Sequence, residues 1–270
     1  MLKRVINNLR NANKFKGSFS EKFSVFFILN RLYIKGLLFK SKTASDHFFN
    51  LKITGPNYFN LNYLFNEIFI SNDYYFESSK KEPLIIDCGA NIGVSVLYFK
   101  TLFPNAKILA FEPNPYAFQL LNNNIKDNNI SNIELYNVAL YNKETEISFF
   151  IRNNIGTLDG SANKSRGGET ELKVRAKKLS HYLVNFQEID LIKMDVEGAE
   201  INIINDLFES GYINKAKEYI IEYHHNISGD NALLSSFLQK FEQNGFSYNI
   251  KTSYSKKASF QDILICFYRA

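Results

Sequence analysis

The stretch LIIDCGANIGVSVLYF, from Leu84 to Phe99, joins an apolar run to a second apolar-periodic segment through a turn that contains glycines. The first run, which ends at Asp87, predicts a buried strand, and the second predicts a helix. Gly89, Asn91 and Gly93 lie between them. Such a turn presents backbone N–H groups and a helix N-terminus at the carboxyl edge of a sheet, where α/β folds bind ligands. The stretch therefore predicts a ligand-binding strand–turn–helix unit.

The same alternation of short apolar runs and helical segments continues to the C-terminus. Helices are expected near Ile92–Leu102, Pro115–Asn128, Ala199–Glu209 and Asn231–Asn244. Strands are expected near Leu84–Asp87, Lys107–Phe111, Ile133–Tyr136, Leu191–Met194, Tyr219–Glu222, Ser247–Ile250 and Asp262–Phe267. Helices that alternate with buried strands indicate a mostly parallel sheet with helices on both faces. The predicted fold class is therefore α/β, doubly wound, with seven strands.

Two parts of the chain do not follow this alternation. Between Tyr141 and Lys178, the alternating runs TEISFFI and TELKVRA predict a β-hairpin insertion with a mobile tip. Residues 1–79 are predicted to be a basic, largely helical N-terminal extension, and residues 80–270 the α/β domain.

The positive charge of the chain is concentrated at its start, where the first 42 residues contain ten Lys or Arg against one acid, Glu21. Within this region Lys22–Lys40 combines apolar clusters with Arg31 and Lys35, the composition of a helix on an apolar surface whose cations reach toward water. Three partners stay open for this helix: the main domain, a second subunit in a homo-oligomer, and a membrane surface. Nucleic acid is not expected, because no recognition module accompanies the basic residues.

The cysteines and the apolar stretches of the sequence indicate in which compartment the protein is expected. The two cysteines, Cys88 and Cys266, lie in apolar runs that read as buried strands, so a disulfide framework is not expected. No stretch approaches the roughly 18 apolar residues of a membrane span, and no apolar signal segment follows the basic start. The sequence predicts a cytoplasmic protein, with peripheral membrane contact through residues 22–40 left open.

The loop after the first strand differs from a dinucleotide-binding loop. The spacing is G-x-N-x-G rather than G-x-G-x-x-G, which disfavours a pyrophosphate and hence an NAD-linked dehydrogenase. The second strand ends in LAFEPNP and places Glu112 at its tip, where a carboxylate accepts the two hydroxyls of a ribose. Asp87, Gly89, Gly93 and Glu112 together predict a pocket for an adenosine whose tail is not a diphosphate.

Acidic residues gather at the tips of two later strands. Asp195 ends the fourth strand and is followed by Glu197 and Glu200, and Glu222 shares one face of the fifth strand with His224. Such groups take up a proton or hold a cation, so Asp195 and His224 are the candidate bases. A magnesium ion bridging Asp195 and Glu222 is an alternative, although no residue is assigned as a metal ligand.

These residues resemble the FkbM-type S-adenosylmethionine-dependent methyltransferases. The resemblance covers roughly Ile53 to the C-terminus and rests on IDCGANIGVSVLYF, AFEPNPYAFQLLNNNI, YNVALYN, DLIKMDVEGAEINII and IIEYHHN in that order. It implies a class I methyltransferase sheet whose last strand is antiparallel, S-adenosylmethionine as the methyl donor, and methylation of a hydroxyl on a sugar, glycan or natural product.

The resemblance also implies roles for individual residues. Glu112 would bind the ribose of the donor, and Asp195 would be the acid beside its methyl group, with Glu197 and Glu222 near the acceptor. The remaining donor residues would be Asp87, Gly89, Asn91 and Gly93 around the methionine part and Asn137 and Ala139 beside the adenine.

Two other functions stay open. One is N-methylation, which is disfavoured because the fourth strand ends in DVEG rather than in the Asn-Pro-Pro-aromatic arrangement of many amino-nitrogen methyltransferases. The other is a non-catalytic donor-binding or scaffold protein at a membrane site of glycan assembly. The expected partner is a small-molecule or glycan acceptor.

Overall fold

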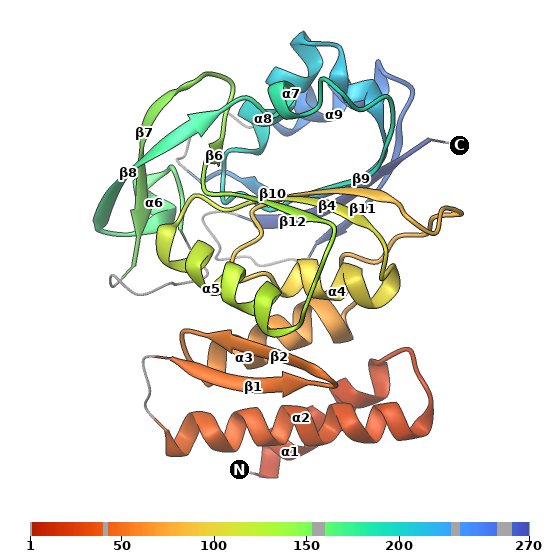
Figure 1. Cartoon of the computed structure of the whole chain (residues 1–270), viewed down its shortest axis with the longest axis vertical. Helices are drawn as coiled ribbons and strands as arrows, with labels where there is room; N and C mark the ends of the chain where they lie inside the picture. Colours follow the sequence, from red (N-terminus) through yellow and green to blue (C-terminus); the bar gives the residue numbers. More distant parts are fainter. Residues whose placement is uncertain (1, 40–42, 153–159, 228–232, 253–260, 270) are drawn as a thin grey trace.

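The computed structural model describes residues 2–39, 43–152, 160–227, 233–252 and 261–269, and it is built around one seven-stranded sheet (Figure 1). β12 is antiparallel to both of its neighbours, and the other pairings are parallel. From edge to edge the strands are β11 (Ser247–Thr252), β12 (Gln261–Tyr268), β10 (Ala216–His225), β9 (Ile189–Met194), β3 (Leu84–Cys88), β4 (Lys107–Phe111) and β5 (Ile133–Tyr136). All seven predicted strands are confirmed, and β10 extends further in both directions than the predicted Tyr219–Glu222.

Helices cover both faces of this sheet, which confirms the doubly wound prediction. α4 (Val94–Leu102) and α5 (Pro115–Asp127) lie on one face (Figure 1). α7 (Leu179–Tyr182), α8 (Glu200–Glu209) and α9 (Leu234–Glu242), with the short 3-10 helix η2 (Tyr212–Lys215), lie on the other. Every residue of β3 and β9 is buried between the two layers, which explains why their sequences are mostly apolar.

The predicted hairpin insertion is also present. β7 (Thr145–Ile151) and β8 (Thr170–Lys177) pair antiparallel, and β6 (Ala139–Leu140) adds to β8 in parallel to give a separate three-stranded sheet. α6 (Lys164–Gly167) lies between the two hairpin strands in sequence. The polar stretch predicted to form a mobile tip spans residues 152–169, and of these residues 153–159 lie outside the described part of the chain.

The N-terminal part forms a layer at the end of the molecule, beneath α4 and α5 in Figure 1. It consists of α1 (Leu2–Lys14), α2 (Phe19–Leu38), β1 (Ala44–Phe48), β2 (Leu51–Gly55), α3 (Tyr58–Leu64) and the π-helix η1 (Phe65–Ile70). α2 matches the helix predicted over Lys22–Lys40 and begins at a capping box, in which Ser18 and Glu21 satisfy each other's backbone N–H groups. The β1–β2 hairpin was not predicted.

A buried acid on β1 is paired with two cations of α2. Asp46 is almost fully buried, and its two carboxylate oxygens lie 2.8 Å from Arg31 Nη2 and 3.0 Å from Lys35 Nζ. An acid in a strand pattern argues against burial when only local sequence is considered. Here the two cations of the neighbouring helix compensate its charge.

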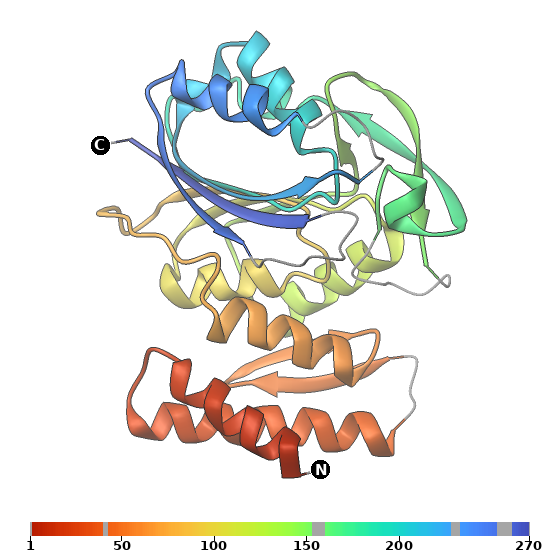
Figure 2. The ribbon, with the colours of Figure 1, turned by 180° about the vertical axis from the view of Figure 1, so that it is seen from behind.

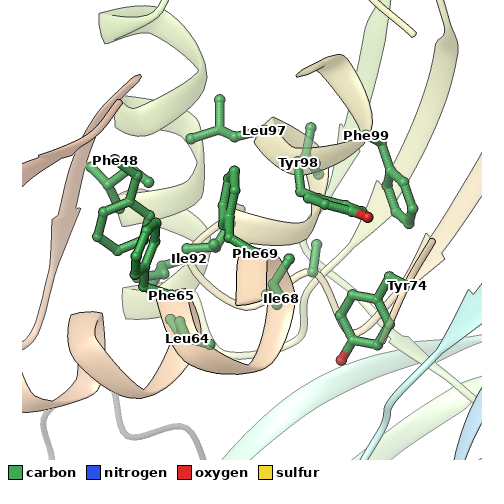
Figure 3. Packing of buried hydrophobic residues seen from close by; sticks show 14 of the residues in the cluster. Phe48, Leu64, Phe65, Ile68, Phe69, Tyr74, Ile92, Leu97, Tyr98 and Phe99 are labelled. Carbon is green, nitrogen blue, oxygen red and sulfur yellow. The ribbon is translucent and has the colours of Figure 1, made fainter. Parts of the chain in front are cut away.

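An aromatic core joins the N-terminal layer to α4 (Figure 3). The rings of Phe48 and Phe65 are 4.7 Å apart, and Phe69 meets Tyr98 of α4 edge-on at 5.4 Å. One apolar cluster therefore runs from α2 to α4 across the predicted boundary at residue 79. This packing fixes η1 beside the helix that follows the glycine turn.

No helix among the described residues is long and apolar enough to cross a lipid bilayer.

Candidate active site

The glycine turn is fitted closely against the end of β9. Gly89 has a φ of +83°, and a Cβ atom built on it would lie 1.8 Å from the carbonyl oxygen of Asp195. The N–H of Asp195 donates to the carbonyl of Cys88 at 3.0 Å, which holds the two strand ends together. A side chain at position 89 would push these segments apart, so glycine is required there.

Glu112, at the tip of β4, is held by backbone groups on both sides. Its Oε1 accepts the N–H of Asn114 at 2.8 Å, and its Oε2 accepts the N–H of Asn91 at 2.9 Å. Burial raises the pKa of Glu112 to about 7, and the two backbone hydrogen bonds partly oppose this shift. The carboxylate is therefore fixed in position with lone pairs left for further donors.

A cavity opens between Glu112, the glycine turn and the three-stranded sheet. Two of its polar lining atoms, Asn91 Oδ1 and Asn114 Nδ2, are buried and have no hydrogen-bond partner among the described residues. Its apolar walls include Phe111, Val138, Ala139, Leu140, Ile147 and Phe149. An apolar slot beside a fixed carboxylate and unsatisfied amide atoms has the apolar walls and the hydrogen-bonding groups that an adenosine requires. These residues fit the adenosine part of S-adenosylmethionine.

The structure brings four of the seven predicted donor residues to this cavity: Gly89, Asn91, Glu112 and Ala139. The other three support its walls. Asn137 Nδ2 donates to the carbonyls of Glu112 and Pro113 at 2.8 and 3.2 Å. Gly93 is the N-cap of α4, and Asp87 is completely buried beneath the turn.

Asp87 is part of an ion pair that the sequence analysis did not identify. Its Oδ1 lies 3.1 Å from Lys193 Nζ, and its Oδ2 accepts the hydroxyl of Ser95 at 2.5 Å. Lys193 also donates to the carbonyl of Gly89 at 2.7 Å, and its side chain is almost completely buried. The lysine therefore fixes both the strand end and the glycine turn from below. In the sequence, the sign of this ion pair was a lysine within the otherwise largely apolar run DLIKMD.

Asp195 lies on a wall shared by two cavities. It lines the cavity beside Glu112 and also a second, smaller cavity bounded by η1, α4 and the glycine turn. Its Oδ2 accepts the hydroxyl of Tyr74 at 3.2 Å. The predicted catalytic position thus faces both the donor cavity and a space partly enclosed by the N-terminal layer.

The N-terminal layer contributes a second carboxylate to this space. Glu67, on η1, lines the smaller cavity and accepts the hydroxyl of Tyr63 at 3.0 Å. Burial, and then the charge of Asp195, raises the pKa of Glu67 to about 7. Glu67 and Tyr74 were not predicted as site residues, because no motif surrounds them and their proximity to Asp195 arises only in the folded chain.

His224 and Glu222 lie behind Asp195 in a cluster of acids. His224 Nδ1 is 2.9 Å from Glu200 Oε1, and its Nε2 is 3.1 Å from Glu197 Oε2 and 4.0 Å from Glu222 Oε1. Burial alone would lower the pKa of His224, but Glu200 and Glu197 outweigh it and raise the pKa well above its usual range. Burial, followed by Asp195, raises the pKa of Glu222. The two carboxylates therefore favour the charged form of the His224 ring, which offsets part of the negative charge of this cluster.

The hairpin insertion packs on the same cluster. Arg166 Nε donates to Glu197 Oε2 at 2.5 Å, and the Ser161 hydroxyl donates to the carbonyl of Glu197 at 2.5 Å. Arg166 Nη2 also lies 3.9 Å from Asp262 Oδ1. The described part of the insertion thus anchors the turn that follows Asp195.

The same side chains meet the distance requirement for a metal site but not its charge requirement. Ligand atoms of Asp195, Glu197 and His224 lie within 4.8 Å of one another, as do those of Glu222, His224 and Asp262. Both sets include His224, whose two nitrogens already face carboxylates as a cation, whereas a metal ligand must be a neutral imidazole. Neither set contains both Asp195 and Glu222, the pair that the magnesium ion was predicted to bridge, so the described side chains give this ion no support and no chemical step is assigned to it.

The fold and the site together define a class I methyltransferase. A family profile described as "Methyltransferase FkbM domain" matches residues 87–248, which include the glycine turn, Glu112, Asp195 and His224. This protein belongs to the FkbM methyltransferase family.

Relatives and solved structures agree with this membership. Methyltransferase sdnD of Sordaria araneosa is 30% identical over 178 residues, which cover 54% of this chain and 69% of that protein. The 2-O-methyltransferase NoeI of Sinorhizobium fredii is 29% identical over 141 residues, covering 46% of this chain and 57% of NoeI. The crystal structure of methyltransferase FkbM from Methylobacillus flagellatus superposes with a TM-score of 0.50 at 14% identity, covering 98% of this chain and 59% of that one.

Proposed function

We propose that the protein transfers a methyl group from S-adenosylmethionine to a hydroxyl of a sugar, glycan or natural product. The observation that carries this proposal is the position of Asp195 on the wall between two cavities. One cavity has the groups that an adenosine requires, and the other is lined by a second acid, Glu67. The similarity to NoeI, a 2-O-methyltransferase by name, supports a hydroxyl as the acceptor.

The donor site is formed by fixed groups. When bound, S-adenosylmethionine supplies an electrophilic methyl group on a sulfonium. Glu112 accepts the ribose hydroxyls, and Asn91 and Asn114 offer the unsatisfied amide atoms to the rest of the nucleoside. Because the carboxylate is already held by two backbone N–H groups, little reorganisation is needed on binding.

The acceptor site holds and deprotonates a hydroxyl. Asp195 and Tyr74 orient the acceptor beside the donor cavity, and such positioning contributes up to ~7–11 kcal/mol in favourable cases. With S-adenosylmethionine bound, the donor would supply the methyl group and leave as S-adenosylhomocysteine, and the Glu67 carboxylate would take the proton from the attacking acceptor hydroxyl. A base with a pKa of about 7 suits this role, because it is largely ionised just above neutral pH and still accepts a proton readily.

His224 is assigned a supporting role in this scheme. As an imidazolium between Glu200 and Glu197, it has no free lone pair with which to take the proton. It keeps several carboxylates close together at the tips of β9 and β10. Glu222, with its raised pKa, adds a neutral carboxyl beside Asp195 at neutral pH.

The test measures release of S-adenosylhomocysteine with a panel of glycans and hydroxylated natural products. The wild-type kcat/KM for the acceptor, measured with saturating donor at every pH so that Glu112 does not contribute, is expected to rise with pH up to about 7 and then level off, because ionised Glu67 is required. Glu67→Gln is expected to lower the rate by roughly 100-fold or more and to remove this rise. The matched control is Glu77→Gln, which alters an exposed acid that is also hydrogen-bonded by a tyrosine hydroxyl.

Other outcomes separate the competing functions. Unchanged rates in both Glu67→Gln and Asp195→Asn would overturn the acceptor site. Transfer to amines but not to hydroxyls would establish N-methylation instead. Donor binding without turnover on any acceptor would favour a scaffold protein, and loss of activity after exhaustive chelation would restore the magnesium hypothesis.

A further inference from the structure

α1 is attached to the molecule through its polar face. Its buried residues are Asn8 and Ala12, of which Ala12 joins the apolar core. Hydrogen bonds also join α1 to the body, from Arg4 to Asn62 at 2.9 Å, from Asn8 to Asn30 at 3.1 Å and from Asn11 to Asn66 at 2.8 Å. The apolar residues Leu2, Ile6 and Leu9 are 74%, 43% and 52% exposed. An amphipathic helix in a soluble domain normally has the opposite orientation, with its apolar face toward the core.

α2 adds a second exposed apolar face. Val25, Ile28, Leu29 and Leu32 are buried against the body. At 100° per residue, the exposed apolar side chains fall within an arc of about 100° on the opposite side of the helix. These side chains are Phe19, Phe23, Phe27, Ile34, Leu37 and Leu38.

Cations accompany both faces. Lys3, Arg10 and Lys14 are exposed and lie along one flank of the apolar face of α1. Residues 2–39 contain eight Lys or Arg and a single acid, Glu21, which is used in the capping box of α2. Arg31 and Lys35 share the one buried carboxylate of Asp46, so this pair of cations still carries excess positive charge.

We propose that α1 and the exposed face of α2 form a docking surface for an anionic lipid bilayer. Large apolar side chains enter the headgroup region, and the flanking cations meet lipid phosphates. A second copy of the chain is a poorer partner, because two strongly basic surfaces would face each other. Figures 1 and 2 show both helices in the outer layer at one end of the molecule, where a flat surface can reach them.

The test is flotation of the full chain with vesicles, with or without about one third phosphatidylglycerol in phosphatidylcholine. We expect binding to the anionic vesicles, weakened by salt, and little binding to phosphatidylcholine alone. Phe19→Ser/Phe23→Ser/Phe27→Ser and Lys3→Gln/Arg10→Gln/Lys14→Gln are each expected to lower the partition coefficient, the second on the order of 100-fold.

The matched control removes three exposed lysines elsewhere, Lys81→Gln/Lys126→Gln/Lys143→Gln, and is expected to bind like the wild type. Because the substituted side chains are exposed, thermal unfolding should be almost unchanged in all three variants.

Failure of the wild-type chain to float with anionic vesicles at low salt would overturn the proposal. An equal fall of the partition coefficient in the control and in Lys3→Gln/Arg10→Gln/Lys14→Gln would also overturn it, since net charge alone would then explain binding. A dimer in sedimentation experiments that the phenylalanine substitutions dissociate would show that a second copy covers the face. None of these measurements needs donor or acceptor, so their outcome is independent of the proposed methyl transfer.

Discussion

Replacing Lys193 with methionine is expected to destabilise the protein more than any surface substitution. The ammonium group lies 3.1 Å from Asp87 Oδ1 and 2.7 Å from the Gly89 carbonyl, and both charged side chains are almost fully shielded from water. Methionine fills a similar volume but leaves the Asp87 charge buried with Ser95 as its hydrogen-bond donor. Breaking a buried pair in this way costs about 3–5 kcal/mol.

The double variant Asp87→Asn/Lys193→Met separates this cost from a simple packing defect. It removes both charges, so it is expected to be about 1–3 kcal/mol more stable than Lys193→Met alone. For a chain of this size, the single variant should unfold roughly 10 °C below the wild type.

Urea unfolding followed by circular dichroism gives the free energies of unfolding of the four proteins in the cycle: wild type, both single variants and the double variant. A loss below about 1 kcal/mol for Lys193→Met, or a double variant no more stable than this single variant, would refute the assignment of a compensating ion pair beneath the glycine turn.

Two further predictions concern the same loop and its carboxylate. Gly89→Ala should cost at least ~2 kcal/mol and weaken donor binding, because its Cβ overlaps the Asp195 carbonyl. The control is Gly211→Ala, at a similar φ of +74° but with no atom within 4 Å of the added Cβ, and it should cost only the ~1–2 kcal/mol of left-handed backbone strain. Equal losses of unfolding free energy for the two variants in urea would contradict a clash at position 89. The raised pKa of Glu112, about 7 against 4.5, means that the folded chain binds more protons than the unfolded chain between these values, so this group lowers stability as pH rises through that window. The wild type should therefore lose roughly 3 kcal/mol relative to Glu112→Gln between pH 4.5 and 7, and parallel pH profiles of the two unfolding free energies would contradict this.

The large sheet was predictable because most residues of a buried parallel strand are apolar. β3, β4 and β9 each combine a mostly apolar sequence with turn residues at its end, and the positions of Glu112 and Asp195 follow directly. The position of the cavity proposed for the donor was predictable for the same reason, since strand tips on one edge of a sheet must converge. The antiparallel direction of β12 came from the family resemblance rather than from its own residues.

The smaller cavity, which we propose for the acceptor, was not predictable, because it depends on contacts between distant segments. Tyr74 and Asp195 are 121 positions apart, and Glu67 reaches the cavity only because the aromatic core holds η1 against α4. The β1–β2 hairpin was not predicted for the same reason, since the cations that compensate the charge of Asp46 lie on α2. Local patterns cannot show that a buried charge has a partner elsewhere in the chain.

The most direct test of the account is calorimetric titration of the wild type and of Glu112→Gln with S-adenosylmethionine, S-adenosylhomocysteine and NAD. We expect micromolar binding of the two sulfur nucleosides and a loss of roughly 10-fold or more in the variant, because the ribose hydroxyls lose an ionised acceptor. It also predicts that wild-type affinity rises with pH through about 7 as Glu112 ionises. Absence of binding, preference for NAD, or equal affinity in the variant would contradict the assignment of this cavity as the donor site.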